Sequence, residues 1–303
     1  MKIIATGGAG FIGSHLVDRL VIKGHHVMIL DDFSSGNREF VNPKAELSET
    51  DIRDTDAVND AFSSFGPEVV FHLAAQIDLR ESLENPEKSY EVNVTGSKNV
   101  IRASQSFNVK KVIFASSGAV YGDSQNLPIK ESEPITKSTP YGEQKAEIEK
   151  ALKESGIPSI VLRYANVYGP RQGTIGEGGV IAIFCKKLIS DEPLTIFGSG
   201  EQTRDFINVN DIVSANIAAL ESSQKFGIYN VSTAHETSIN DITKKLLTIS
   251  NKSVKVERTE PVLGEVLHNS LDNSKIREKF AWSPKIDIIQ GLKETWDWFS
   301  KNL

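Results

Sequence analysis

The chain has 303 residues and a formal net charge of −6, from 34 Lys and Arg against 40 Asp and Glu. That length accommodates one large α/β domain, or a large and a small domain together. Hydrophobic residues make up 39% and charged residues 24%, which is typical of globular proteins and excludes a disordered or fibrous chain. The acidic balance argues against a nucleic-acid-binding protein, because such proteins usually carry a basic patch.

Two further features concern the compartment. Cys185 is the one cysteine, so no internal disulfide can form, and this favours a reducing environment. No apolar run approaches the ~18–20 residues that cross a bilayer. The first apolar run meets glycine at Gly7, too early for a signal peptide. We therefore expect a cytoplasmic protein that has neither a membrane nor a nucleic acid as its partner.

The first two-thirds of the chain alternate short apolar runs with longer amphipathic ones, the pattern of parallel βαβ units. Runs rich in Val, Ile and Phe predict strands at Lys2–Thr6, His26–Asp31, Ala45–Glu49, Glu68–Ala74, Lys111–Ser117, Ser159–Tyr164 and Gly227–Val231. Helical periodicity and capping residues predict helices at Phe11–Gly24, Asp54–Phe65, Pro86–Phe107 and Pro140–Ser155.

This rhythm changes after Tyr168, where the Gly-rich stretch Gly169–Gly179 predicts a loop. The later segments predict a helix at Ile181–Ser190, a strand at Leu194–Phe197, a helix at Asn210–Ser222, a helix after Ala234, a strand at Val254–Glu257 and a C-terminal helix with Trp296, Trp298 and Phe299. We expect an α/β fold with a doubly wound parallel sheet in residues 1–168, joined by 206–233. Residues 169–205 and 234–303 should form a smaller domain over the carboxyl ends of the strands, where such sheets bind ligands.

The first strand runs directly into the glycine motif Thr6-Gly7-Gly8-Ala9-Gly10-Phe11-Ile12-Gly13, which opens the first helix. Glycines here permit a tight turn and let the backbone approach a pyrophosphate, which the N–H groups of the helix start can bind. A glycine pattern alone is weak, but its strand–turn–helix context is that of a Rossmann dinucleotide site. A Walker-type phosphate loop is excluded, because no Gly-Lys-Ser/Thr follows.

The second strand ends in an acid, Asp31, 18 positions after Gly13. A carboxylate there accepts hydrogen bonds from a ribose diol and repels a 2′-phosphate, which favours NAD over NADP. The plainer interpretation of Asp31 is a cap for the turn at Ser34-Ser35-Gly36. The glycine motif and the acid together predict NAD as the cofactor.

A possible catalytic set follows the fifth strand. Tyr141 and Lys145 lie four apart on one helix and so share a face, and Ser117 ends the strand upstream. A phenol has a pKa near 10 and is a poor base at neutral pH. One unit charge at ~4 Å in an effective dielectric of ~20 contributes about 4 kcal/mol before desolvation, on the scale of three pKa units. Lys145 and the positive nicotinamide could thus make Tyr141 a base for a sugar hydroxyl, with Ser117 hydrogen-bonded to the same oxygen. The plainer interpretation is an exposed helix pair and a capping serine.

These motifs resemble the extended short-chain dehydrogenase/reductase family, and most closely its nucleotide-sugar epimerase branch, over nearly the whole chain. The resemblance implies that the catalytic residues are Ser117, Tyr141 and Lys145. It implies cofactor contacts from Gly7, Gly10, Phe11, Ile12, Gly13, Asp31, Asp32, Asp51, Ile52, Leu73, Ala74, Ala75, Asn93, Tyr141 and Lys145. It implies substrate contacts from Ser117, Tyr141, Asn166, Val180, Arg204 and Asn269. Independently of the resemblance, the planar guanidinium of Arg204 suits a diphosphate.

The activity implied is an NAD-dependent 4-epimerase of a nucleotide-diphosphate hexose, such as UDP-glucose or UDP-galactose, acting through a transient 4-keto sugar. Dehydratases of this family place an acidic pair where this chain has Gly118 and Ala119, and the extra residues of the decarboxylases are not recognised here. A UDP-glucuronate 4-epimerase and a nucleotide-4-keto-sugar reductase remain open. A non-catalytic dinucleotide sensor is disfavoured, because such proteins usually lose the Tyr or the Lys.

The chain departs from the epimerase pattern at two places. Val262, in Val262-Leu263-Gly264-Glu265, stands where many epimerases carry a diphosphate-binding Arg, and Arg258 is a possible substitute. Asn269 is smaller than the Tyr of hexose-restricted members, which suggests room for an N-acetyl group. The resemblance also implies a homodimer through the helices at Pro86–Phe107 and Pro140–Ser155. No metal is expected, since His15, His25 and His26 lack a partner set, and Cys185 should lie in the core.

Overall fold

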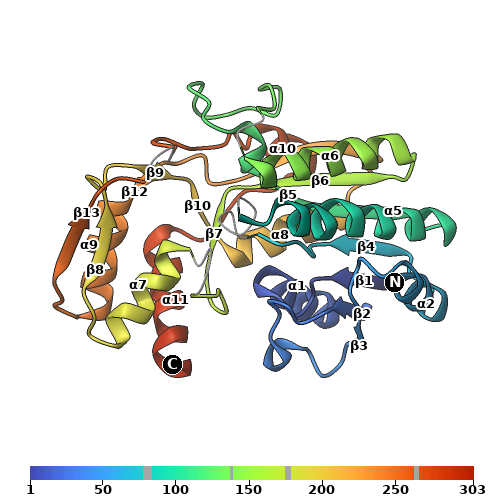
Figure 1. Ribbon diagram of the computed structural model, residues 1–303, viewed down its shortest axis with the longest axis horizontal. Coiled ribbons are helices and arrows are strands. Elements are labelled where there is room, and N and C mark those ends of the chain that lie inside the picture. The colour runs from blue at the N-terminus through green and yellow to red at the C-terminus, as the bar shows by residue number, and fades with distance from the viewer. Residues whose placement is uncertain (78–83, 137–138, 175–178, 263–265) are drawn as a thin grey trace.

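The computed structural model describes residues 1–77, 84–136, 139–174, 179–262 and 266–303. Within these ranges seven strands form one sheet in the order β11-β6-β5-β4-β1-β2-β3, and every neighbouring pair is parallel (Figure 1). Their bounds are β1 Lys2–Thr6, β2 His26–Asp31, β3 Glu46–Glu49, β4 Val69–His72, β5 Lys111–Ser117, β6 Ser159–Tyr164 and β11 Phe226–Val231. The reversal of strand order beside β1 confirms the predicted doubly wound fold.

The central strands bury both of their faces, because alternate side chains enter different cores, whereas the edge strand β3 has no buried residue. Ile3 and Ala5 of β1 pack in one hydrophobic cluster, whereas Ile4 between them packs in the other. The first cluster lies against the helices α1 Phe11–Ile22, α8 Val209–Glu221 and α10 Ser274–Phe280. The second lies against α2 Thr55–Phe65, α5 Ser97–Ser106 and α6 Pro140–Ser155. This two-sided burial explains the nearly continuous apolar strand sequences.

Local signals start α2 and α6 as predicted. The carboxylate of Asp54 accepts hydrogen bonds from the N–H groups of Asp56 and Ala57 at the start of α2. Helix α6 has Pro140 in its first turn, capped by the hydroxyl of Thr139.

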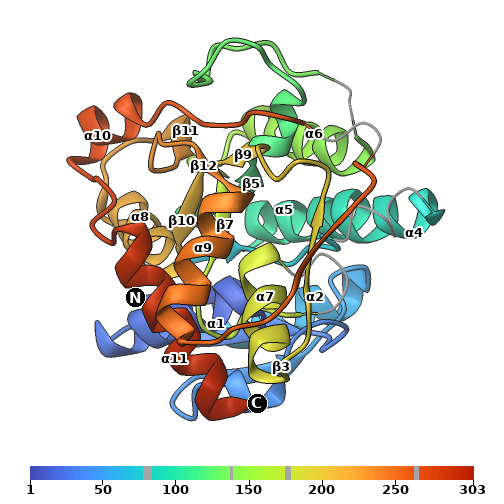
Figure 2. The same ribbon diagram turned by 90° about the vertical axis from the view of Figure 1, so that its left-hand side faces the viewer.

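A second group of elements lies beside the sheet, on the left of Figure 1 and facing the viewer in Figure 2. It comprises α7 Val180–Ile189, β8 Leu194–Phe197, α9 Ile239–Ser250, β13 Val256–Thr259 and α11 Ile288–Asn302. These elements share a hydrophobic core of their own, which includes Cys185 at 0% exposure, as predicted for that residue. Trp296 and Trp298 pack at the edge of this core, so the aromatic residues anchor α11.

The remaining short elements differ most from prediction. The helix predicted at Pro86–Phe107 is divided into α4 Pro86–Tyr90, a π-helical turn η2 Glu91–Gly96, and α5. Strands of two or three residues and single helical turns escape periodicity: β7 Asn166–Tyr168, β9 Thr203–Arg204, β10 Phe206–Asn208, β12 Thr237–Ser238, η1 Arg38–Phe40 and η3 Gly118–Tyr121. The strand predicted at Val254–Glu257 begins at Val256, because its pairing with β8 sets the register. None of the helices in the described ranges is long and apolar enough to cross a membrane.

Candidate active site

The glycine motif forms a turn so tight that side chains cannot be added to it. Gly7 has φ +67°, and its N–H donates to the carbonyl oxygen of Leu30 at 2.8 Å. A Cβ on Gly13 would lie 2.0 Å from the carbonyl oxygen of Gly7, and one on Gly7 would lie 2.7 Å from the nitrogen of Ala74. Helix α1 then begins after Gly10 without a side-chain cap. Its first N–H groups can therefore bind an anion, as a pyrophosphate site requires.

Asp31 supports this turn as well as ending β2. Its Oδ2 accepts the N–H of Ala9 at 2.9 Å, and its Oδ1 accepts the N–H of Phe33 at 3.0 Å. Burial raises the pKa of the carboxyl, and these two bonds oppose that rise. The plainer interpretation from the sequence is therefore confirmed, since Asp31 caps the following turn, and its carboxylate also lies beside the glycine motif. The neighbouring Asp32 is exposed and accepts bonds from Ser34.

The pair Asp51 and Ile52 follows β3 at the same edge of the sheet. The guanidinium of Arg53 forms several hydrogen bonds with the Asp51 carboxylate, which lower the pKa of Asp51. Ile52 is 5% exposed, and its side chain fills the space over Gly96, where a Cβ would lie 2.6 Å away. The end of β3 therefore offers two different groups: the Asp51 carboxylate, which is held by Arg53, and the buried apolar side chain of Ile52.

A buried histidine connects the glycine turn to the π-helical turn. His72 at the end of β4 is 1% exposed, with Nδ1 at 2.7 Å from Thr6 Oγ1 and Nε2 at 2.7 Å from Ser97 Oγ. Because Ser97 donates its proton to the carbonyl oxygen of Asn93, it must accept from Nε2–H, and Thr6 then donates to Nδ1. The N–H of Ala74 donates to Thr6 in turn. The chain of bonds fixes one neutral tautomer and places the Leu73-Ala74-Ala75 segment beside the glycine motif.

Because His72 is buried and neutral, we expect the stability of the fold to decrease in acid. Burial lowers the pKa of His72 to about 3, from 6.5 in an unfolded chain. Below pH 6.5 the unfolded state therefore binds a proton that the folded state refuses, so stability falls as pH falls, by up to ~1.4 kcal/mol per pH unit. We expect the unfolding free energy, measured with denaturant at several pH values between 6 and 4, to depend less steeply on pH in His72→Gln than in wild type. The difference in slope should correspond to about one proton. Equal slopes in the two proteins would contradict this assignment.

Asn93 joins three segments around the same region. Its Oδ1 accepts the N–H of Gln76 at 2.8 Å, and its Nδ2 donates to the carbonyl oxygen of Gln76 and to Oε1 of Gln144 on α6. Ser89 also donates to Gln144. The side chain thus ties the loop after β4 to the helix that carries Tyr141.

Tyr141 and Lys145 lie on the same face of the first turns of α6, as predicted. The Lys145 ammonium is 5.6 Å from the centroid of the Tyr141 ring, and it donates to the carbonyl oxygen of Ala115 at 2.8 Å. It also lies 4.8 Å from the centroid of the Phe114 ring. Lys145 is 4% exposed, and burial lowers its pKa to about 7, against the opposing effect of Glu149. An ammonium so placed favours the phenolate of the tyrosine.

The end of β5 meets the start of α6 closely. A Cβ on Gly142 would lie 2.6 Å from the carbonyl oxygen of Ala119, so only a glycine after Tyr141 allows this approach. Ser117 is two residues before Ala119, whose N–H donates to the Ser117 hydroxyl at 3.1 Å. The structure therefore brings the turn that follows Ser117 against the turn that carries Tyr141, and Ser117 also caps η3.

The predicted substrate residues are joined by a buried acid that sequence reasoning did not single out. Asp205 is fully buried, and its carboxylate accepts bonds from the N–H and hydroxyl of Thr233, and from the N–H groups of Ala234 and Leu271. Its carbonyl oxygen accepts the N–H of Asn166 at 2.9 Å. Burial raises the pKa of Asp205, and the four donors oppose that rise. The carboxylate thus joins the exit of β11 to the segment that contains Asn269, and the backbone carbonyl of the same residue holds the exit of β6.

Replacing this carboxylate tests its role. In Asp205→Asn an NH₂ group faces N–H donors, and leaving one buried group without a partner costs ~1–3 kcal/mol. We expect the KM for the substrate to rise about tenfold or more, with bound cofactor retained and the melting temperature lowered. Asp241→Asn, at an exposed acid of α9, is the matched control. An unchanged KM in Asp205→Asn would show that the carboxylate does not position substrate contacts.

Arg204 lies next to Asp205, with Nη1 donating to the carbonyl oxygens of Thr203 and Val266 at 2.8 and 2.7 Å. The possible substitute Arg258 donates instead to Ser199 and Asn240, where it holds the turn around Gly200. Arg258 thus stabilises a turn, and its contacts differ from those of Arg204. Val262 is exposed, whereas Leu263, Gly264 and Glu265 of the same motif lie outside the described residues.

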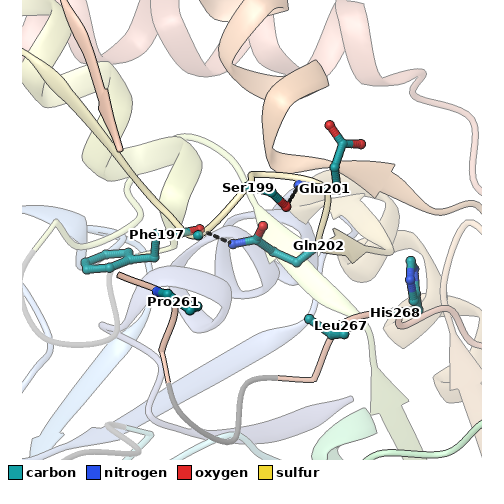
Figure 3. A pocket seen from close by; sticks show the side chains of 8 residues that line it. Phe197, Ser199, Glu201, Gln202, Pro261, Leu267 and His268 are labelled. Atoms are coloured by element: carbon teal, nitrogen blue, oxygen red, sulfur yellow. Dashed lines mark hydrogen bonds between the residues drawn. The ribbon is translucent and has the colours of Figure 1, made fainter. Parts of the chain in front are cut away.

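A cavity of about 180 Å³ opens beside this segment (Figure 3). It is lined by Phe197, Gly198, Ser199, Glu201, Gln202, Pro261, Leu267 and His268. Gln202 Nε2 donates to the carbonyl oxygen of Phe197, and the N–H of Thr203 to that of Leu267, so the cavity borders the strand of Arg204. Asn269, two residues after Leu267, is partly buried. Val180 begins α7, and residues 175–178 before it lie outside the described ranges.

Two residues of this site, His72 and Asp205, were missed although each carried a signal. Both are titratable side chains in otherwise apolar stretches, His72 inside Val-Val-Phe-His-Leu and Asp205 before Phe-Ile. Buried polar groups need partners, so such residues are candidates for hydrogen-bond networks. In the part of the chain that is described, no group of three or more His, Cys, Asp or Glu residues is placed to hold a metal ion.

Comparison with known proteins shows the family of the chain. Residues 3–232 match the NAD dependent epimerase/dehydratase family. A putative UDP-glucose 4-epimerase of Methanocaldococcus jannaschii is 42% identical, over 99% of both chains. The crystal structure of UDP-glucose 4-epimerase with UDP-glucose from Thermotoga maritima has a TM-score of 0.97 and 39% identity, covering 100% of this chain and 99% of that one. UDP-N-acetylglucosamine 4-epimerase from Methanobrevibacter ruminantium M1, in complex with UDP-N-acetylmuramic acid, has a TM-score of 0.94 and 35% identity, covering 100% and 99%.

A doubly wound parallel sheet with a glycine turn at β1 and a Tyr–Lys pair on the helix after β5 defines a dinucleotide-dependent enzyme of the extended short-chain dehydrogenase/reductase class. The chain belongs to the NAD-dependent epimerase/dehydratase family within that class.

Proposed function

We propose that this protein is an NAD-dependent 4-epimerase of nucleotide-diphosphate hexoses, with UDP-glucose and UDP-galactose as its first candidate substrates. The observation that carries the proposal is the buried Lys145 ammonium beside the Tyr141 ring, on a helix packed against the turn after Ser117. The relatives at 42% and 39% identity are named for the same activity, which supports it.

The cofactor end of the site fits NAD. The glycine turn leaves no room for side chains, the start of α1 offers N–H groups for a pyrophosphate, and Asp31 offers a carboxylate suited to a ribose diol. When bound, NAD supplies a hydride acceptor and, once reduced, a hydride donor. We assign the adenosine side to Asp32, Asp51 and Ile52, and the nicotinamide side to Leu73, Ala74, Ala75 and Asn93.

In the mechanism, Tyr141 takes the proton of the sugar 4-hydroxyl while Lys145 stabilises the phenolate, and Ser117 hydrogen-bonds the same oxygen. The product of this half-reaction is a 4-keto sugar. Asn166 and Arg204 hold the diphosphate while the sugar turns, which keeps the ketone at high effective concentration. Tyr141 then returns the proton to the oxygen on the inverted carbon. Since hydride is removed and returned in one cycle, the net reaction is redox-neutral.

Two features near Arg204 and Asn269 indicate which nucleotide and which sugar the site accommodates. The cavity beside Arg204 offers apolar surface from Phe197, Pro261 and Leu267, which suits the base end of a nucleotide. The family resemblance assigns Asn269, a short side chain, to the sugar end, and a similar protein is named UDP-N-acetylglucosamine 4-epimerase. We propose that the enzyme accepts N-acetylated UDP-hexoses as well.

We further propose a working division into an NAD-binding domain, 1–168 with 206–233, and a substrate-binding domain, 169–205 with 234–303. Strand β11 belongs to the main sheet and α7, α9 and α11 share a separate core, which supports this division. We propose that the enzyme is a cytoplasmic homodimer formed through α5 and α6, whose outer faces are exposed. Light scattering of the purified protein tests the dimer.

The test of function is a turnover assay with substoichiometric NAD⁺ and, in turn, UDP-glucose, UDP-galactose, their N-acetylated forms and UDP-glucuronate. We expect interconversion of the C4 epimers to many times the amount of enzyme without accumulation of NADH. A 4-keto-sugar reductase would instead consume NADH in proportion to product. Absence of interconversion for all of these sugars would refute the proposal.

A further inference from the structure

A buried ion pair lies behind the Tyr141–Lys145 pair. Glu149 on α6 accepts the Nη2 and Nε protons of Arg163 on β6 at 2.5 and 2.9 Å. The two side chains are 3% and 2% exposed. Glu149 Oε1 also accepts the hydroxyl of Ser116 at 2.6 Å, and Ser116 is opposite Arg163 in the pairing of β5 with β6. One carboxylate thus joins three elements of the site.

The position of Glu149 in the helix relates this cluster to the proposed chemistry. It lies four residues after Lys145 and eight after Tyr141, so the three side chains share one face of α6. Its partner Ser116 is the immediate neighbour of Ser117. Any displacement of Glu149 would therefore change the distance between the end of β5 and the face of α6 that carries Tyr141.

The surroundings of Lys145 explain why the charge of Glu149 affects its protonation. Tyr141 and Glu149 face it from its own helix, the Phe114 ring and the carbonyl of Ala115 from β5, and the neutral His72 from β4. Arg163 on β6 stands behind Glu149. Burial lowers the pKa of Lys145 to about 7, and the negative charge of Glu149 raises it. The carboxylate therefore counteracts the desolvation that would otherwise remove the proton of Lys145.

Stability alone does not account for this pair. A buried ion pair often contributes nothing net, because desolvation of the two charges offsets their attraction. The guanidinium also stacks at 4.7 Å over the Tyr121 ring, and among the described residues its Nη1 is buried without a hydrogen-bond partner. The cluster is thus a costly arrangement placed next to the catalytic set.

We propose that Glu149 is a positioning residue for the reaction, which keeps the Lys145 ammonium charged and locks α6 to the end of β5 through Ser116 and Arg163. Glu149 acts through Lys145 and does not touch the substrate. This inference rests on the proposed function, since it concerns the tyrosine–lysine base of the epimerase.

The test is the pH dependence of kcat in the NAD-bound holoenzyme of Glu149→Gln, expressed as a ratio to wild type. Glutamine keeps the size and most hydrogen bonds and removes the charge. On the alkaline side, we expect the pH at which half of the kcat is lost to be about one unit lower in Glu149→Gln than in wild type. The kcat of the variant relative to wild type should therefore drop about tenfold between pH 6 and pH 9. Glu154→Gln, at an exposed acid of the same helix, should keep a ratio near one throughout.

A ratio for Glu149→Gln that is reduced equally at every pH would overturn the electrostatic role. If this variant fails to fold because Arg163 is left buried without its partner, Glu149→Gln with Arg163→Gln replaces it; because Arg163 lies behind Glu149, we expect a smaller alkaline shift of the same sign. Failure of both variants to fold or to retain NAD would make the pair purely structural and would also overturn the proposal. Wild-type protein that does not epimerise any sugar would reject the proposed function instead, so the two failures are distinguishable.

Discussion

Tyr141→Phe is expected to reduce kcat for epimerisation by about 10²–10⁴-fold, the range that a general base contributes. The ring keeps its place beside the Lys145 ammonium, 5.6 Å away, and only the hydroxyl that carries the proton is lost. Bound NAD should be retained, because the glycine turn and Asp31 are untouched. The measurement is the turnover of UDP-galactose by the purified holoenzyme, with the NAD content determined after denaturation.

The matched control for this variant is Tyr90→Phe. Tyr90 is exposed on α4, and within the described part of the chain its hydroxyl donates to Glu147. Its removal should leave kcat within about twofold, since surface changes of this kind are usually small. Retention of near wild-type turnover by Tyr141→Phe would reject Tyr141 as the base.

Gly13→Ala is expected to abolish retention of NAD. Its Cβ would lie 2.0 Å from the carbonyl oxygen of Gly7, and this neighbour is backbone held by a hydrogen bond to Leu30. The turn must therefore open, and the N–H groups at the start of α1 lose their alignment toward the pyrophosphate. Purified protein should carry less than about a tenth of the wild-type NAD, a loss of about 1.4 kcal/mol or more in binding.

Gly173→Ala provides the control for an added methyl group, because nothing lies within 4 Å of its Cβ position. It should retain NAD and melt close to wild type. Normal NAD content in Gly13→Ala would mean that the cofactor does not lie on the glycine turn.

Much of the fold followed from local sequence patterns. Both faces of the central strands are buried, so their apolar runs were continuous and their limits were within a few residues of those observed. Caps such as Asp54 act through hydrogen bonds to residues two or three positions on, which sequence order alone reveals. The π-helical turn at Glu91–Gly96 was not predictable, because periodicity indicates only that a helix is present.

The candidate site was predictable where its residues are near one another in sequence. Tyr141 and Lys145 are one helical turn apart, and the glycine motif is contiguous. Contacts between distant residues were not predicted: the bond from Ala9 to Asp31, the Thr6–His72–Ser97 network, and the Asp205 contacts to Thr233 and Leu271. Such contacts depend on the order of strands in the sheet, which a single sequence does not specify.

The central claim is that hydride leaves carbon 4 of the sugar and returns to the same carbon while Tyr141 carries the proton of the hydroxyl. The most direct measurement is NMR of UDP-galactose labelled with deuterium at carbon 4, after equilibration by the NAD-bound holoenzyme in ordinary water. Deuterium should be found at carbon 4 of both epimers, without loss to solvent. Replacement of the label by hydrogen from water would show that the carbon is inverted by proton exchange, which would contradict the hydride mechanism.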